Sequence, residues 1–178
     1  MENPMVLPEF QNSYGMSVPY DDFCKETSKS FHEKYDGGRL PVKKGVRELL
    51  QFLKEQKYII GLASSTKEAT VYRQIEEAGL LDYFQNLTCG DMLKKSKPEP
   101  DIYLMACDNL KINPGEAIAI EDSYNGIRSA YRAGLYPVMV SDMIEPNEEM
   151  KELSAKIFEN LFVVKEWLLR ANDMPMGD

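Results

Sequence analysis

From Pro41 onward, short runs with the character of strands alternate with longer stretches whose apolar residues recur at helical spacing. The runs cover residues 58–63, 85–90, 117–120 and 136–140. The stretches between them, and residues 46–53 before the first, place apolar residues at helical intervals, as in helices that cover a sheet. Strands and helices in this order form right-handed βαβ units around parallel strands. The sequence therefore predicts an α/β fold with a mostly parallel sheet flanked by helices.

Residues 1–40 have a different character. Three prolines and Gly15 interrupt the first 19 residues, so regular structure there is expected to be short. Residues 21–35 have the pattern of a helix, and the pair Gly37-Gly38 is expected to end it. We therefore expect two parts, a small N-terminal one at 1–37 and a core at 38–178.

Composition narrows the class of protein further. The net charge of −8 excludes a nucleic-acid-binding face, which needs a basic stripe. The three cysteines include no C-x-x-C pair and suit free thiols in a reducing compartment. We see no basic N-terminal region followed by an apolar core, and no apolar run near the ~20 residues of a membrane span. We therefore expect a cytoplasmic protein with no membrane partner.

Two adjacent acids, Glu121 and Asp122, follow the strand predicted at 117–120. Acids at the carboxyl end of a buried parallel strand lie where open α/β sheets bind ligands. They carry a desolvation cost unless they are paired or hold a metal. Magnesium prefers a few carboxylate oxygens, several waters and a substrate phosphate. The alternative is that Asp122 or Ser123 only caps the next helix, which Gly126 allows to approach the strand closely.

Hydroxyl groups follow the strand predicted at 58–63, in Ser64, Ser65 and Thr66. Hydroxyls and free amides at a helix N-terminus can bind an anion. The alternative is that they cap the helix, and both roles can hold with different hydroxyls.

Lys97 is followed by Pro98, which stiffens the backbone just before a predicted helix at 100–110. A fixed ammonium there could offset the charge of about −1.5 to −2 on a phosphomonoester. The alternative is a solvated basic loop, which is what we expect of the neighbouring Lys94 and Lys95.

Three segments together carry a family resemblance, namely 62–66 (LASST), 97–103 (KPEPDIY) and 120–127 (IEDSYNGI). They resemble three of the four motifs of the haloacid dehalogenase superfamily, and look closest to its β-phosphoglucomutase-like phosphatases and phosphomutases. The resemblance covers about residues 38–170. It implies a Rossmann-like parallel sheet and a helical cap inserted after the first strand, of which residues 1–37 would be a remnant.

The resemblance also implies roles for individual residues. Ser64 resembles the hydroxyl that binds the transferring phosphoryl group, with Ser65 and Thr66 beside it. Lys97 resembles the lysine that neutralises that group and orients the nucleophile. Asp122 resembles the protein ligand of Mg²⁺, with Glu121 ligating or supporting. The implied partner is a small phosphorylated metabolite of the sugar-phosphate type, or inorganic phosphate.

The family's first motif, Asp-x-Asp at the end of the first strand, has no match in this sequence. No two aspartates are separated by one residue, and Asp21-Asp22 follows no buried strand. We therefore expect no nucleophile and no turnover. The missing strand would lie between those that end at Ser64 and Asp122. Met5-Val6-Leu7 could fill the place although Pro4 and Pro8 suit a central strand poorly, the flanking strands could pair directly, or another chain could supply a strand.

Three functional hypotheses remain open. The first is a magnesium-dependent phosphatase or phosphomutase that lacks its N-terminal part. The second is a non-catalytic binding or assembly module that holds phosphate or magnesium without turnover and can self-associate. The third is one half of a split enzyme that receives a strand from a separate chain.

Overall fold

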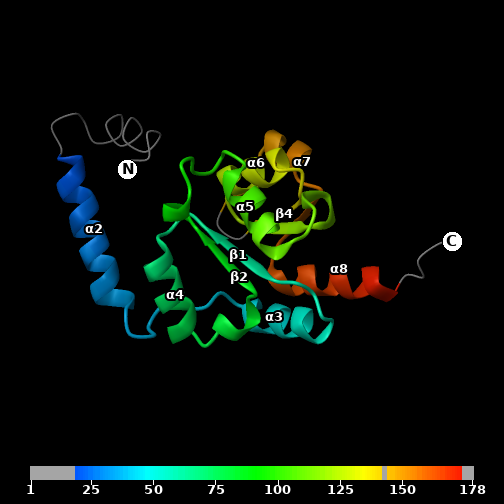
Figure 1. The fold of residues 1–178 in the computed structure, drawn as a ribbon, viewed down its shortest axis with the longest axis horizontal. Helices are drawn as coiled ribbons and strands as arrows, with labels where there is room; N and C mark the ends of the chain where they lie inside the picture. The colour runs from blue at the N-terminus through cyan, green and yellow to red at the C-terminus, as the bar shows by residue number, and fades with distance from the viewer. Residues whose placement is uncertain (1–18, 142–143, 174–178) are drawn as a thin grey trace. The chain divides into compact units, whose positions relative to one another are not determined.

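The computed structural model describes residues 19–141 and 144–173 (Figure 1). The chain divides into two compact units, Met1–Pro41 and Val42–Asp178. The described part of the first unit contains helix α2 (Tyr20–Tyr35), which confirms the helix predicted at 21–35. Gly37 and Gly38 follow it with φ angles of 75° and 77°, a conformation that glycine adopts without strain. The segment Met5-Val6-Leu7 lies outside the described residues.

The second unit confirms the predicted alternation of strands and helices. Its helices and strands are α3 (Val46–Glu55), β1 (Gly61–Ser64), α4 (Glu68–Glu77), β2 (Asn86–Cys89), α5 (Asp101–Leu110), β3 (Ile118–Glu121), α6 (Tyr124–Arg132), β4 (Tyr136–Val140), α7 (Glu148–Leu153), β5 (Lys156–Phe158) and α8 (Leu161–Asp173). Short 3-10 turns form η1 (Leu81–Tyr83), η2 (Gly90–Met92) and η3 (Pro114–Glu116). Strand β5 was not predicted, because three residues are too few to show a period. No helix among the described residues is long and apolar enough to cross a bilayer.

Strand β1 begins later than the predicted residue 58, because the preceding residues have other partners. The Tyr58 amide donates to the Leu53 carbonyl at 2.9 Å and so closes helix α3. The Ile60 amide donates to the side chain of Gln85 at 2.6 Å instead of to a neighbouring strand. Regular pairing with β2 therefore starts at Gly61, opposite Asn86.

The strands form two parallel groups rather than one continuous sheet. Strand β1 pairs with β2, and the second group has the order β3-β4-β5. Every pair is parallel, which confirms the predicted α/β class. Direct pairing of β1 with β3, one of the three possibilities for the central place, does not occur between these described strands.

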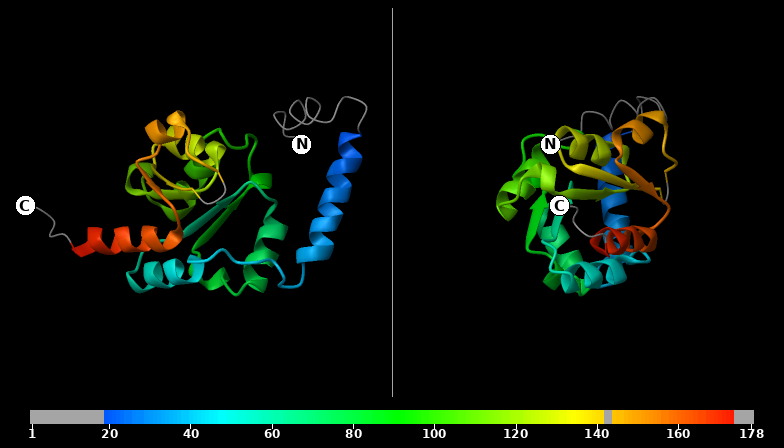
Figure 2. Two further views of the ribbon diagram at one scale, coloured as in Figure 1. Left: turned by 180° about the vertical axis from the view of Figure 1, so that it is seen from behind. Right: turned by 90° about the vertical axis from the view of Figure 1, so that its right-hand side faces the viewer.

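Helices on both sides hold the two groups together (Figures 1 and 2). On the side of α3 and α8, Phe52 packs with the β4 residue Val138, whereas Leu50 packs with Ile60 beside β1. On the side of α5 and α6, Ala63 of β1 and Ala119 of β3 pack in one cluster with Tyr103 of α5. Each fully buried Leu, Val or Phe side chain contributes about 1.5–3 kcal/mol. The helices therefore join β1 to β3 without strand pairing.

Candidate functional site

The two neighbouring acids end strand β3 and have different surroundings. Ser123 is the N-cap of α6, because its hydroxyl accepts a hydrogen bond from the Gly126 amide at 3.0 Å. The alternative that Asp122 or Ser123 caps this helix is therefore confirmed for Ser123. A Cβ atom on Gly126 would overlap the Glu121 carboxylate, so this glycine allows the close approach that the sequence predicted.

Glu121 is a largely buried acid whose two oxygens already accept hydrogen bonds. Its side chain is 9% exposed. One oxygen accepts from the Lys97 ammonium and from the Tyr103 hydroxyl, and the other accepts from the Ser123 hydroxyl at 3.1 Å. Removing one partner of such a buried pair leaves an uncompensated charge, which is strongly destabilising. Burial and the adjacent Glu121 carboxylate raise the pKa of the Tyr103 hydroxyl, so it remains protonated and donates.

Lys97 is a largely buried cation with several fixed partners. Its side chain is 12% exposed, whereas Lys94 and Lys95 are exposed, as the sequence predicted. Besides Glu121, its ammonium donates to the Ala63 carbonyl of β1 at 3.3 Å and lies 5.0 Å from the centre of the Tyr103 ring. The alternative of a solvated loop is therefore wrong for Lys97.

Helix α6 anchors the loop that carries Lys97. The buried Ser129 hydroxyl donates to the Glu99 carbonyl at 2.6 Å. The Arg132 guanidinium donates to the Pro98 carbonyl at 3.1 Å and to the Glu99 carboxylate at 3.3 Å. These contacts fix the backbone just after Lys97, so the ammonium has few alternative positions.

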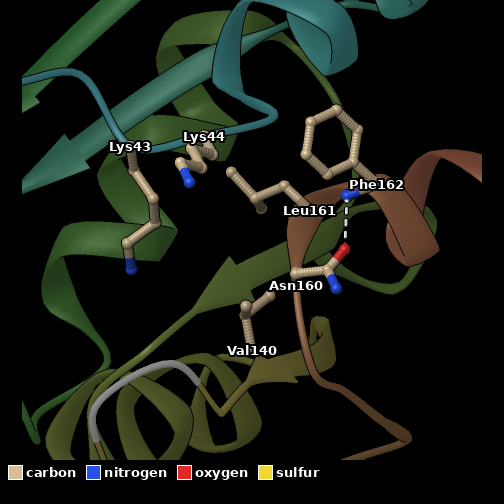
Figure 3. A pocket seen from close by; sticks show the side chains of 6 residues that line it. All are labelled: Lys43, Lys44, Val140, Asn160, Leu161 and Phe162. Carbon is tan, nitrogen blue, oxygen red and sulfur yellow. Dashed lines mark hydrogen bonds between the residues drawn. The ribbon is translucent and has the colours of Figure 1, made fainter.

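Asp122 differs from Glu121 in both exposure and partner. Its side chain is 60% exposed, and its carboxylate lies 3.2 Å from the ammonium of Lys43, which precedes α3. Lys43 also lines a cavity of about 270 Å³ with Lys44, Val140, Asn160, Leu161 and Phe162 (Figure 3). The Asp122 carboxylate is thus accessible to solvent, at the carboxyl end of β3.

The three hydroxyl residues lie at the carboxyl end of β1. Ser64 is half-buried and its hydroxyl accepts from the Thr66 amide at 3.2 Å, while Ser65 and Thr66 are exposed. Their predicted alternative role as caps of α4 is wrong. The N-cap position belongs to Lys67, and the Asp91 carboxylate accepts from the Glu68 amide at 2.9 Å in place of a hydroxyl.

The structure therefore brings together some predicted residues and adds others. Lys97 contacts both Glu121 and the carbonyl next to Ser64, whereas Asp122 contacts Lys43. Sequence reasoning placed Tyr103 only on the inward face of a helix and did not single out Lys43. The signal for Tyr103 was its hydroxyl at a position expected to be buried, since such a group needs a partner. Lys43 carried no comparable signal.

Comparison with known proteins identifies the family. Residues 2–140 match the model of the haloacid dehalogenase-like hydrolases. The chain is 35% identical over 91 residues to a phosphorylated carbohydrates phosphatase of Thermotoga maritima, covering 51% of this chain and 42% of that protein. It is 36% identical over 96 residues to a β-phosphoglucomutase of Bacillus subtilis, and the match covers 54% of this chain and 42% of that protein.

A solved structure, CbbY from Rhodobacter sphaeroides in complex with phosphate, superposes with a TM-score of 0.68 at 26% identity, over 82% of this chain and 65% of that one. The chain belongs to the haloacid dehalogenase-like hydrolase family. It spans about half the length of the curated relatives it matches.

Proposed function

We propose that the unit 42–178 binds phosphate, or the phosphate group of a small phosphorylated metabolite, at the carboxyl ends of β1 and β3. The observation that carries this is the position of Lys97, a largely buried ammonium 3.3 Å from the Ala63 carbonyl, next to Ser64. Its relatives in the family include proteins named as phosphatases of phosphorylated carbohydrates and a phosphoglucomutase. A sugar phosphate is therefore the substrate class that we assign to this lineage.

Each predicted residue has a place in this proposal. The hydroxyls and amides of Ser64, Ser65 and Thr66 bind the phosphate oxygens. The Lys97 ammonium offsets their charge, because a charge-assisted hydrogen bond is about twice as strong as a neutral one. Glu121 supports the site by holding Lys97, since both its oxygens are engaged.

Asp122 is the residue proposed to hold Mg²⁺. Among residues 19–141 and 144–173, no group of three or more His, Cys, Asp or Glu side chains is arranged to hold a metal. An exposed carboxylate still fits Mg²⁺, which commonly keeps several waters and takes one or two carboxylates plus substrate phosphate. When bound, the metal supplies positive charge that neutralises the phosphate oxygens and the Asp122 carboxylate.

We further propose that the 178-residue chain binds without turnover. Hydrolysis by this family's route requires an Asp-x-Asp pair, which the sequence lacks. The two acids at the end of β3 are committed elsewhere, Glu121 to Lys97 and Asp122 to the proposed metal, and Asp91 accepts from the Glu68 amide. The chain by itself thus has the binding groups without an attacking group, which is the non-catalytic hypothesis.

A second candidate is one half of a two-part enzyme, favoured by the edges of β1 and β3 that pair with no other strand among residues 19–141 and 144–173. The Ile60 carbonyl accepts from Gln85 and the Ala117 carbonyl accepts from Tyr136, so these residues face their paired strands. Because alternate residues of a strand face opposite edges, Gly61 and Ile120 direct their backbone groups away from β2 and β4. A strand from a separate chain is proposed to pair with these edges.

Isothermal titration calorimetry with inorganic phosphate, with and without Mg²⁺, tests the binding proposal. The unaltered chain should bind phosphate, Lys97→Met should abolish binding while its circular dichroism spectrum shows a folded protein, and the matched control Lys95→Met should retain binding. Equal binding by all three proteins would contradict the proposal. Release of phosphate from small sugar phosphates by the chain alone, abolished by Asp122→Asn, would overturn the proposed absence of turnover.

A further inference from the structure

We propose that Tyr103 is a positioning residue that holds Lys97 beside the Ser64–Thr66 turn, acting through the Glu121 carboxylate. This inference rests on the proposed function, because the position of Lys97 matters only if its ammonium meets a phosphate.

The Lys97 ammonium lies among three acceptors from three different elements. These are the Glu121 carboxylate of β3, the Ala63 carbonyl of β1 at 3.3 Å and the Tyr103 hydroxyl oxygen of α5 at 3.5 Å. Two of the three ammonium donors reach Glu121 and Ala63 and define its position, and the third, at the longer distance from Tyr103, remains for a phosphate oxygen. The aromatic face of Tyr103, 5.0 Å away at the ring centre, adds a cation–π contact.

Tyr103 acts on both members of the ion pair. Its hydroxyl donates to the same Glu121 oxygen that accepts from Lys97. The other Glu121 oxygen is held by Ser123, which also caps α6. Without the Tyr103 hydroxyl, the Glu121 oxygen that faces Lys97 keeps only Lys97 as a donor. The carboxylate can then rotate about the Cγ–Cδ bond and draw the ammonium away from β1.

The fold gives Tyr103 a rigid support for this role. It is 7% exposed and packs in one cluster with Ile102, Ala119 and Ala130, and Ala63 of β1 packs against that cluster. Helix α5 therefore contacts both strand groups at the point where Lys97 joins them. Removing only the hydroxyl, in Tyr103→Phe, leaves this packing in place.

Calorimetry of Tyr103→Phe separates positioning from a general structural role. We expect affinity for inorganic phosphate to fall about five- to tenfold, the size of a typical net hydrogen-bond contribution, because the lost bond acts on phosphate only indirectly. Affinity for Mg²⁺ alone should be unchanged, because Asp122 contacts Lys43 and not this network. The matched control is Tyr83→Phe, whose hydroxyl donates to Gln51 at 3.0 Å in another part of the unit.

Unchanged phosphate affinity in Tyr103→Phe would overturn the inference, as would an equal loss of phosphate affinity, Mg²⁺ affinity and melting temperature. If the variant does not fold, ¹³C-tyrosine NMR of the unaltered chain serves instead. Phosphate should then shift the Tyr103 ring signals in the unaltered chain but not in Lys97→Met, and the absence of a shift overturns the inference. A chain that binds no phosphate at all fails the proposed function itself, which is a different result.

Discussion

Lys43 and Asp122 lie 79 positions apart in the sequence, yet their side chains form an ion pair at 3.2 Å. The ammonium therefore occupies one side of the carboxylate that we propose as the magnesium ligand. A cation that binds Asp122 has to compete with this tethered charge. Because the pair is largely exposed, the competition is modest.

Replacing Lys43 with methionine is expected to raise the affinity for Mg²⁺ by about two- to fivefold, the range of an exposed ion pair. Calorimetry with MgCl₂ at low ionic strength measures it. The control is Lys44→Met, which removes the adjacent charge from the same cavity wall and should have a smaller effect. Weaker Mg²⁺ binding in Lys43→Met than in the unaltered chain would show that Lys43 does not compete.

Gly90 is expected to be essential to the backbone conformation of the Ser64–Thr66 turn. A Cβ atom at this position would overlap the backbone of Ser65, and the Gly90 amide donates to the Thr66 carbonyl at 3.0 Å. Gly90→Ala should destabilise the protein by about 1–3 kcal/mol through overpacking and should weaken phosphate binding. Urea denaturation measures the first effect and calorimetry the second.

Gly115→Ala is the matched control for that substitution, since a Cβ atom there meets nothing within 4 Å. It should leave phosphate affinity unchanged and shift stability by less than Gly90→Ala does. Similar effects of the two substitutions would contradict the close packing of η2 against the turn.

The packing of β4 against α6 and α7 predicts a large effect at Met139. This side chain is fully buried and packs with Ile127 and Met150, also fully buried. Met139→Ala should cost about 2–5 kcal/mol of unfolding free energy, because it removes buried methylene groups and leaves a cavity. Leu169→Ala, at a residue 45% exposed on α8, should cost much less in the same urea titration. A ranking in the opposite order would contradict this core.

The three thiols should differ in reactivity toward a thiol reagent such as DTNB. Cys24 is exposed, whereas Cys89 and Cys107 are buried. Burial, together with Asp91 and Glu68, raises the pKa of Cys89, and burial raises that of Cys107, so both have little reactive thiolate. One thiol should react quickly in the native protein and all three in denaturant. Rapid reaction of all three without denaturant would contradict the packing around β2 and α5.

The fold was predictable from the sequence because the spacing of apolar residues indicates which side chains are buried in helices and strands. The predicted helix at 46–53 appears as α3, and the run at 136–140 is β4. The site was predictable at Lys97, where Pro98 and the following helix indicated a fixed loop. The different roles of Glu121 and Asp122 could not be predicted, because they depend on partners distant in the sequence, Tyr103 and Lys43. The contact of Asp91 with the first turn of α4 could not be predicted for the same reason, since Asp91 lies 23 residues from Glu68.

Phosphate is proposed to bind jointly to the turn at Ser64–Thr66 and to the Lys97 ammonium. Amide ¹H–¹⁵N NMR of the 178-residue chain during titration with inorganic phosphate and Mg²⁺ tests this joint binding most directly. Joint binding predicts saturable shifts of the Ser64, Ser65 and Thr66 amides, and the loss of these shifts in Lys97→Met. Saturable shifts confined to other parts of the chain, or none at all, would contradict it.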